Sequence, residues 1–378
     1  MKFAFIIFKY FPHGGLQLDF FRMLQEAVAR GHEVTIITSI WEDAFLENVQ
    51  YKILQPRAFS NHGFALAFEK LALAYLQTTH FDCVFGFNRM AGLDVYFAGD
   101  NCFRKTSSQK KYWKRLLSHR YNVFEKLEAS IFQPLSSTKI LYISPHQKQD
   151  YIHYYQTQEN RFFYLPPGID PKFHIPQNKD CIRSQVRKQF HISDNQIVLI
   201  QVCSAFYTKG VDRNLYALHA LPKEIKERCI FLVVGSYKHT SMLKLANLLK
   251  IQDKVIFTGV QQNVEDFYLA ADCMIHPARN EAAGNVLIEA LSMGLPVLCT
   301  ENCGYATYVQ QAHNRICPMP FQQDTYNQIL QNILSNEQSL QQMKQDAIQF
   351  ASTQDFYHRA SKAIDYLEIF SHGSSFSK

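Results

Sequence analysis

Apolar and polar positions in the first part of the chain alternate between short apolar runs and longer amphipathic stretches. Residues 2–8 (Lys-Phe-Ala-Phe-Ile-Ile-Phe) have the continuous apolar character of a buried strand. A turn over residues 9–15 precedes an amphipathic helix at about residues 16–30, which Gly31 ends. The next strand is expected at residues 34–38, so these elements form a βαβ unit and predict a parallel sheet. Further strands are predicted at residues 82–87 and 140–144.

The same alternation restarts after residue 180 and predicts a second doubly wound unit. Residues 165–171 (Leu-Pro-Pro-Gly-Ile-Asp-Pro) break regular structure and indicate a linker. The predicted fold class is therefore α/β, with two Rossmann-like domains facing each other across a cleft at the carboxyl ends of their strands. The strands of the second half are expected at residues 197–202, 231–234, 255–257, 273–276 and 296–299. The expected boundaries are residues 1–165 for the N-terminal domain, 166–180 for the linker, 181–352 for the C-terminal domain, and 353–378 for a helix that crosses back to the N-terminal domain.

Composition narrows the class of partner and the compartment. The chain has 378 residues and a net charge of +6, which suits an anionic ligand or membrane better than bulk nucleic-acid binding. Its nine cysteines are scattered, as expected of buried thiols in a reducing compartment. The apolar run at the N-terminus is too short for a signal peptide, and no apolar stretch is long enough to span a bilayer. We expect a cytoplasmic protein, with attachment to a membrane surface left open.

Two glutamates eight positions apart, Glu281 and Glu289, flank the stretch Ala-Ala-Gly-Asn-Val-Leu-Ile. The small residues after Glu281 would let a ligand approach backbone N–H groups at a helix start, with Glu289 about two turns on near the same helix face. One acid could then accept hydrogen bonds from a sugar and the other from a ribose, with phosphates at the helix N-terminus. The alternative is a pair of solvated helix acids. Because the intervening residues are apolar or small, we expect a packed helix on which carboxylates need partners.

Two glycines and a lysine are further candidate site residues, and the glutamate pair makes a functional role for them more plausible. Gly14 and Gly15 follow the first strand, and they form either a plain turn or a turn that brings backbone N–H groups to an anion. Lys209, followed by Gly210, comes after the first strand of the second half. It is either a solvated lysine before a helix or a cation over a diphosphate leaving group, where it would offset charge that develops as a glycosidic bond breaks.

Other candidate chemistry is sparse. Asp100 ends an apolar run and could orient an acceptor hydroxyl, take up its proton, or only cap a helix. The turn at Gly14 is not a Gly-x-Gly-x-x-Gly fingerprint, and no Gly-x-Ser-x-Gly elbow is present, which argues against an NAD enzyme and a hydrolase. His13, His32 and His276 lack metal-ligand spacing and are expected to be structural, so no metal site is predicted.

A basic segment over about residues 103–125 predicts contact with a membrane. From about Gln109 it can form a helix with Trp113, Leu116 and Phe124 on one face and most cations opposite. Such a helix binds anionic lipid surfaces, each cation contributing about 1 kcal/mol. The alternatives are an ordinary helix packed on the core, and an RNA-binding patch, for which the apolar stripe is too continuous. The predicted membrane residues are Arg104, Lys105, Lys110, Lys111, Trp113, Lys114, Arg115 and Arg120.

Several motifs together resemble a known family across almost the whole chain. The run Gly86-Phe-Asn-Arg-Met-Ala-Gly-Leu-Asp-Val-Tyr-Phe-Ala98 is the most specific of them, and Glu281-Ala-Ala-Gly284 with Glu289 is the broadest. The remaining motifs begin at Tyr10, Leu165, Lys209 and Cys303. The sequence resembles family 4 of the retaining glycosyltransferases, and within it the lipopolysaccharide core glucosyltransferases of the WaaG type.

This resemblance implies a GT-B fold, a UDP-sugar substrate and no cofactor or metal. It implies transfer of glucose onto an inner-core heptose of lipopolysaccharide, by a cytoplasmic protein at the inner face of the cytoplasmic membrane. Glu281 would meet the sugar hydroxyls, Glu289 the ribose, and Lys209 the phosphates; with Asp100, Glu281 and Lys209 form the predicted catalytic set. The predicted donor-binding residues are Gly14, Gly15, Lys172, Thr208, Lys209, Gln261, Glu281, Ala283, Gly284, Asn285, Val286 and Glu289.

The sequence also departs from the WaaG pattern around the donor. Thr208 stands where the family has a basic residue, and Cys203 where it has a glycine. Asn285 replaces an apolar residue, and Lys172 could substitute for a cation that relatives place one position later. These departures leave two alternatives open: a transferase of the same family with another UDP-sugar, or a UDP-sugar epimerase of the same fold. A non-catalytic membrane-binding module is disfavoured by the full set of donor residues.

Overall fold

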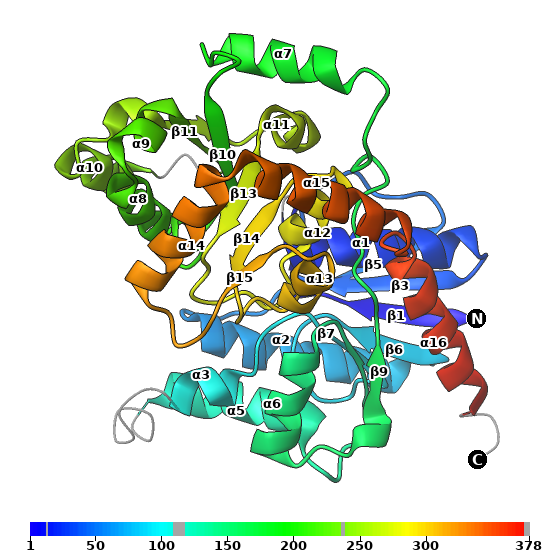
Figure 1. Ribbon diagram of the computed structural model, residues 1–378. Helices are drawn as coiled ribbons and strands as arrows, with labels where there is room; N and C mark the ends of the chain where they lie inside the picture. The colour runs from blue at the N-terminus through cyan, green and yellow to red at the C-terminus, as the bar shows by residue number, and fades with distance from the viewer. Residues whose placement is uncertain (13, 109–117, 236–238, 374–378) are drawn as a thin grey trace. The chain divides into compact units, whose positions relative to one another are not determined.

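The computed structural model describes residues 1–12, 14–108, 118–235 and 239–373 (Figure 1). The chain forms two compact units, one from Met1–Gly168 with His358–Lys378, and the other from Ile169–Tyr357. A parallel sheet lies at the centre of each unit, with helices in the connections between its strands. The predicted α/β class with two Rossmann-like domains is therefore confirmed.

The first unit contains, in its described part, a seven-stranded parallel sheet in the order β5-β3-β1-β6-β7-β8-β9. Its central strand β1 is buried almost throughout, as its run of apolar residues predicts. The strands are β1 (Lys2–Ile6), β3 (Glu33–Thr38), β5 (Val49–Ile53), β6 (Cys83–Gly86), β7 (Val95–Ala98), β8 (Lys139–Tyr142) and β9 (Phe162–Tyr164), with a small pair β2 (Lys9–Tyr10) and β4 (Ile40–Trp41). The helices are α1 (Gly15–Ala29), α2 (Asn61–Thr78), α3 (Phe103–Ser108), α5 (His119–Phe132), α6 (Pro145–Tyr155) and α16 (Arg359–Gly373), with the short 3₁₀ turn Glu159–Arg161.

Apart from residues 236–238, which lie outside the described ranges, the second unit contains a six-stranded parallel sheet in the order β12-β11-β10-β13-β14-β15. Strand β10 pairs with β11 on one side and β13 on the other, so the direction of winding reverses between β10 and β13. The strands are β10 (Ile197–Cys203), β11 (Cys229–Gly235), β12 (Val255–Gly259), β13 (Cys273–His276), β14 (Val297–Thr300) and β15 (Arg315–Cys317). The helices are α7 (Lys179–Gln189), α8 (Val211–Ala220), α9 (Lys223–Arg228), α10 (Thr240–Leu248), α11 (Val264–Ala270), α12 (Asn285–Ser292), α13 (Ala306–Gln311), α14 (Gln323–Ser335) and α15 (Glu337–Ser352), with the 3₁₀ turn Gln252–Lys254.

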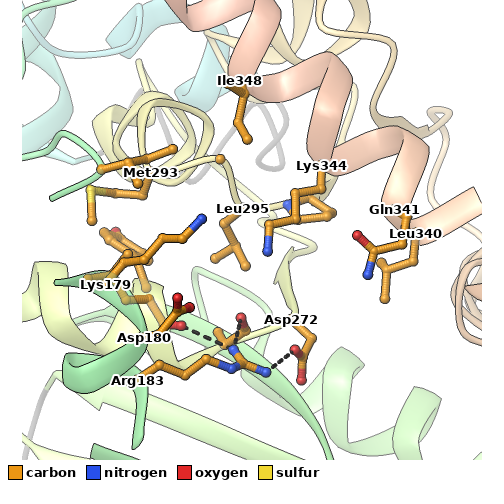
Figure 2. A pocket seen from close by; sticks show the side chains of 16 residues that line it. Lys179, Asp180, Arg183, Asp272, Met293, Leu295, Leu340, Gln341, Lys344 and Ile348 are labelled. Carbon is orange, nitrogen blue, oxygen red and sulfur yellow. Dashed lines mark hydrogen bonds and ion pairs between the residues drawn. The ribbon is translucent and has the colours of Figure 1, made fainter. Parts of the chain in front are cut away.

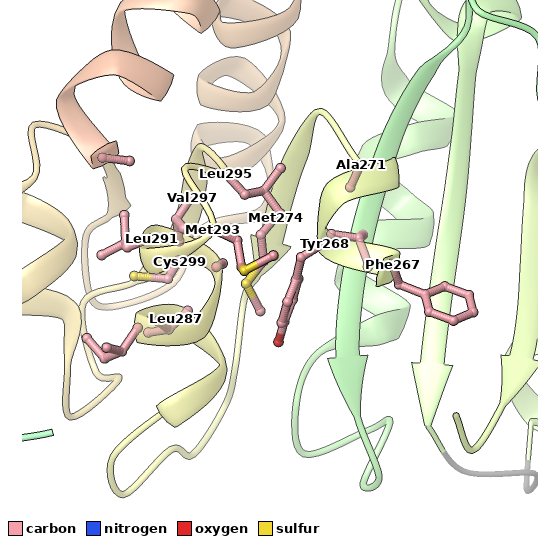
Figure 3. Close-up of a cluster of buried hydrophobic side chains, with 14 of the residues drawn as sticks. Phe267, Tyr268, Ala271, Met274, Leu287, Leu291, Met293, Leu295, Val297 and Cys299 are labelled. Carbon is pink, nitrogen blue, oxygen red and sulfur yellow. The ribbon is translucent and has the colours of Figure 1, made fainter. Parts of the chain in front are cut away.

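Alternation along β10 gives the second unit a core on each face of its sheet. Val198 and Ile200 belong to one apolar cluster and Leu199 to the other, as the two-residue period of a strand requires. Figure 3 shows part of the first cluster, where Leu287 and Leu291 of α12 lie near Met274 of β13. This packing fixes α12 against the sheet and thereby sets the position of the residues that precede it.

Some predicted elements differ from the observed ones. The turn predicted over residues 9–15 contains β2, because Lys9 and Tyr10 pair with Ile40 and Trp41. The first strand ends at Ile6 rather than at residue 8, and the last helix begins at Arg359 because the Asp355 carboxylate accepts from the Tyr357 N–H just before it. Strands β4, β5, β7, β9 and β15 were not predicted. Strand β5 is mostly exposed, β4, β9 and β15 have two or three residues, and β7 is buried but has only four. In the described ranges, no helix is both long and apolar enough to cross a membrane.

Helix α16 completes the first unit by packing against α1. Arg359 and Asp19 are both buried, and the Arg359 Nη1 atom lies 2.8 Å from Asp19 Oδ1. The Arg359 Nε atom also donates to the Pro166 carbonyl oxygen at 2.8 Å. Burial takes both charged groups out of water, and the ion pair replaces hydrogen bonds to water that each group loses.

We expect Arg359→Met to lower the free energy of unfolding by about 3–5 kcal/mol, because it leaves the Asp19 carboxylate buried without its charged partner. Urea unfolding followed by circular dichroism would measure the change. Lys362→Met, on an exposed position of the same helix, is the matched control and should be close to neutral. Equal stability of the two variants would contradict the assigned role of the pair.

Candidate functional site

The carboxyl ends of β10 and β13 bring the chemistry of the second unit together. These strands are neighbours, with Ile200 opposite Met274. The chain leaving β10 carries Lys209, and the chain leaving β13 carries Glu281. The winding of the sheet reverses at this point, which is where open α/β sheets form ligand sites.

Lys209 and Glu281 are in direct contact. The Lys209 Nζ atom lies 2.8 Å from Glu281 Oε2, and it also donates to the Asn280 carbonyl oxygen at 3.3 Å. Gly210 makes this approach possible, because its φ is +77° and an added Cβ would lie 2.1 Å from the Pro277 carbonyl oxygen. The two loops are therefore in close contact, which brings Lys209 to Glu281.

His276 is the third member of this cluster, although the sequence predicts only a structural role for it. Its Nε2 atom lies 3.0 Å from the same Glu281 Oε2 atom, and the ring is fully buried at the end of β13. Within the described residues the buried Nδ1 atom has no hydrogen-bond partner. The sequence does place a histidine at the end of a buried strand, five residues before Glu281, and this position could have indicated a role in the site.

The surroundings keep the Glu281 carboxylate charged. Burial raises the pKa of Glu281, but the hydrogen bond with His276 and the charge of Lys209 outweigh burial and bring the pKa to about 2. The group is therefore ionised above about pH 3 in the folded protein. A charged, oriented acceptor beside a lysine suits the recognition of hydroxyl groups next to a phosphate.

The segment after Glu281 forms an anchored start to α12. Gly284 precedes the helix with φ +99°, and the Tyr305 N–H donates to the Ala283 carbonyl oxygen at 2.8 Å. A Cβ on Gly304 would lie 2.0 Å from the Ala282 carbonyl oxygen, so the two backbones touch. Backbone N–H groups at the start of a fixed helix are a suitable site for a phosphate.

Glu289 lies on α12 itself, and the predicted geometry of the glutamate pair needs correction. The helix begins at Asn285, so Glu281 precedes it and the two acids do not share a helix face. Glu289 accepts a hydrogen bond from the Tyr268 hydroxyl at 2.9 Å. Burial and the charge of Glu289 raise the pKa of Tyr268 far above its usual value, so the hydroxyl keeps its proton and donates.

Arg279 lies next to the loop that carries Thr208, and it was not among the site residues predicted from the sequence. Its guanidinium makes two contacts of 2.7 and 2.6 Å with the Asp212 carboxylate and lies 3.9 Å from the centre of the Tyr207 ring. Its backbone N–H donates to the Thr208 carbonyl oxygen at 2.8 Å. The clamp fixes the loop that carries Lys209, and it places a positive charge close to the position where the WaaG pattern has its basic residue.

The other predicted donor residues of this unit have intramolecular partners. Lys172 Nζ lies 2.7 Å from the Glu265 carboxylate and 3.3 Å from the Gln262 carbonyl oxygen. The Gln261 amide donates to the carbonyl oxygen of Thr258, near the end of β12, at 2.8 Å. The roles of Lys172 and Gln261 in donor binding stay predictions. Cys203 stands where the WaaG pattern has a glycine, and burial raises its pKa to about 12, so its thiol stays neutral.

The remaining predicted site residues belong to the first unit. Gly14 and Gly15 begin α1, where Gly14 is the residue before the helix. The Asp100 carbonyl oxygen accepts from the buried Tyr151 hydroxyl at 2.9 Å. Arg89, from the most specific sequence motif, donates to the Asn101 carbonyl oxygen at 2.7 Å and lies 3.2 Å from the buried Glu128 carboxylate. The loop that carries Asp100 is thus held in place by Arg89, which is itself paired with the buried Glu128.

The basic segment is described only at its ends. Arg104 donates to the Tyr154 carbonyl oxygen at 2.9 Å, Lys105 pairs with Asp150 at 2.8 Å, and the Arg120 guanidinium lies 5.8 Å from the Phe124 ring centre. The predicted helix from residue 109 cannot be compared over its first part, since α5 begins at His119 and Lys110, Lys111, Trp113, Lys114 and Arg115 lie outside the described residues.

Each of the two units matches a known family of glycosyltransferases. Residues 13–173 match the family described as Glycosyltransferase Family 4, and residues 182–350 match Glycosyl transferases group 1. The chain is 36% identical over 365 residues to the lipopolysaccharide glucosyltransferase WaaG of Escherichia coli K12, covering 96% of this chain and 98% of that protein. The chain belongs to the family 4 glycosyltransferases. The resemblance to the WaaG type inferred from the sequence motifs is confirmed, and the protein is a glycosyltransferase.

Two solved structures have the same fold as this chain. The crystal structure of WaaG, described as involved in lipopolysaccharide biosynthesis, matches with a TM-score of 0.89 over 97% of this chain and 99% of that one, at 36% identity. A structure of Alr3699/HepE from Anabaena with UDP and glucose matches with a TM-score of 0.74 over 97% of this chain and 99% of that one. At 17% identity, this second likeness shows the fold alone.

Among the described residues, no cluster of three or more His, Cys, Asp or Glu side chains is arranged to hold a metal ion. The candidate site combines a lysine, acids and a helix N-terminus. These groups can bind a sugar and a diphosphate directly, by charge and by hydrogen bonds.

Proposed function

We propose that this glycosyltransferase moves glucose from UDP-glucose onto an inner-core heptose of lipopolysaccharide, with retention of anomeric configuration. The observation that carries the proposal is the contact of Lys209 with Glu281 beside the anchored start of α12. Similarity to WaaG over nearly the full length of both chains supports the choice of glucose and of the acceptor. No metal or cofactor is needed for this chemistry.

The donor's groups have matching partners in the second unit. The sugar hydroxyls bind Glu281, whose Oε2 atom is held by His276 and Lys209, and the Oε1 atom is left to accept from the donor. The ribose binds Glu289. The diphosphate lies at Lys209 and the N–H groups of Ala283, Gly284, Asn285 and Val286, where a cation and a helix start stabilise the charge of departing UDP.

The acceptor hydroxyl attacks from the face that the leaving group vacates. A departing phosphate oxygen on this face can take the acceptor proton, so that no enzymic nucleophile is required. Asp100 then orients the acceptor hydroxyl from the first unit. The contributions of Gly14 and Gly15 to phosphate binding, of Lys172 and Thr208 to the donor, and of Gln261 to the uracil belong to the same proposal.

UDP release from a panel of UDP-sugars, with and without delipidated core oligosaccharide from a strain that lacks this step, tests the proposal. Release that requires the acceptor and is fastest with UDP-glucose is the expected result. Acceptor-dependent release with another sugar would replace the donor but keep the reaction. Isomerisation of a UDP-sugar without acceptor would overturn the transferase assignment in favour of an epimerase.

We further propose that the enzyme works at the inner face of the cytoplasmic membrane, attached through its basic segment. Replacing Lys110, Lys111, Lys114 and Arg115 by Gln should lower binding to anionic vesicles, since each cation contributes about 1 kcal/mol near such a surface. Sedimentation with phosphatidylglycerol vesicles measures binding, and turnover on a soluble acceptor should be unchanged. Replacement of Lys188, Lys223, Lys244 and Lys250, in the other unit, controls for the loss of net charge. Equal vesicle binding by both variants would refute the membrane role of the segment.

A further inference from the structure

A pocket lies at the opposite edge of the second sheet from Lys209 and Glu281. Asp272 stands directly before β13, and residues 294–296 stand before β14, so the pocket opens at the amino ends of these strands. Its other walls come from α7 and α15 (Figure 2). The cavity has a volume of about 90 Å³, several times what one water molecule requires.

The floor of the pocket is apolar and closely packed. Met293, Leu295 and Ile348 line it, and Gly294 adopts φ +68° in the turn between the first two. A Cβ on Gly294 would lie 2.7 Å from Ile348 Cγ1 and 3.1 Å from Ile175 Cδ1, so the turn fits only with glycine. An apolar group could therefore be enclosed by this floor.

Two lysines point into the same space above the floor. Lys179 extends from α7 and Lys344 from α15, toward each other on either side of Leu295 (Figure 2). Neither ammonium group makes a hydrogen bond or an ion pair with another described residue. Both side chains keep access to solvent, so the mouth of the pocket is open to a ligand.

Lys344 also interrupts an apolar stripe. It lies four residues from Leu340 and from Ile348, and all three line the pocket. A packing role would favour an apolar residue at this position. Burial lowers the pKa of Lys344, and the positive charges of Arg183 and Lys179 lower it further, which an anion between them would reverse.

The acids at the pocket do not neutralise these lysines. Asp272 is already held by Arg183 at 2.6 Å and by Arg187 at 2.7 Å, and it accepts the Val198 N–H at 2.7 Å. Asp180, on the first turn of α7, and the already paired Asp272 offset the charge of Lys344 only in part, since its pKa is still lowered. We infer that this pocket is a second ligand site, which takes a small organic anion with a carboxylate or phosphate head group between the two lysines and an apolar group on the floor.

The intact protein labelled with ¹³C at its methionine methyl groups tests this inference, since Met293 reports from the floor. Titration with phenyl phosphate and with benzoate should shift the Met293 signal saturably, and the tighter ligand identifies the head group. Benzyl alcohol, which lacks the charge, should bind at least tenfold more weakly. Equal binding of the alcohol, or no saturable shift with either anion, would overturn the inference.

Variants separate a binding role from a structural one. Lys344→Gln and Lys179→Gln should each weaken binding about tenfold, and Lys188→Gln, elsewhere on α7, should not change it. Lys344→Met keeps the apolar stem, so it should lose binding without lowering the melting temperature. Glu289→Gln should leave binding intact, which excludes the donor site as the source of the signal. Full affinity in Lys344→Met would contradict the inference even if the other variants failed to fold.

Discussion

Glu281→Gln is expected to reduce kcat/KM for acceptor-dependent UDP release by about 10²–10³-fold, with a melting temperature close to that of the unmodified protein. The substitution keeps the shape of the side chain but removes the charge that Lys209 and His276 hold in place. An amide binds sugar hydroxyls more weakly than a carboxylate, and it removes the negative charge that pairs with Lys209. The loss should therefore appear in transfer rather than in folding.

Glu224→Gln is the matched control, because this substitution removes the same charge from the same unit at an exposed position on α9. UDP release on UDP-glucose and thermal unfolding by circular dichroism should be measured on both variants. Normal turnover in Glu281→Gln would sink the assigned site. A large fall in melting temperature would instead assign Glu281 a structural role.

His276→Leu is expected to lower kcat/KM about tenfold to a hundredfold near neutral pH and more strongly in acid. The hydrogen bond from His276 to a charged carboxylate contributes about 1.5–3 kcal/mol. It is also the largest effect that lowers the pKa of Glu281 to about 2 against the opposing effect of burial. Without it the pKa rises, so the carboxylate protonates at a higher pH and activity on the acid side is lost earlier.

The pH dependence of kcat/KM distinguishes this role from packing. In His276→Leu the acidic limb should move to higher pH, whereas a packing defect would lower the whole profile without moving it. His276→Gln can place an N–H group near the position of Nε2, so it should restore the limb in part. An unchanged limb in the leucine variant would show that Lys209 alone keeps Glu281 ionised.

The hydrophobic pattern predicted most of the inner strands of both sheets because these strands are buried on both faces, although it missed the four-residue strand β7. Strand β10 is an example: it begins with the four apolar residues 197–200, and it lies between β11 and β13. Edge elements carry no such signal. Strand β5 exposes most of its residues and β15 has only three, so their pairing depends on neighbours far away in the sequence.

The site was partly predictable for a related reason. Lys209 and Glu281 follow strands that the alternation identifies, so their neighbourhood could be inferred before the structure was known. The role of His276 was missed, because its position at the end of a buried strand, five residues before an acid, does not show which atom its ring faces. Arg279 looked like an ordinary surface cation, and only the folded loops show that it clamps Asp212 beside Thr208.

The placement of α16 has a consequence for synthesis. The ribosome completes the second unit before it makes α16, so the first unit must wait, through the translation of almost two hundred residues, for the helix that covers α1. Until then Asp19 lacks Arg359, and the α1 face meant for α16 stays open to water and to chaperones. A stop codon shortly before α16 would therefore damage the unit encoded first and spare the one encoded last.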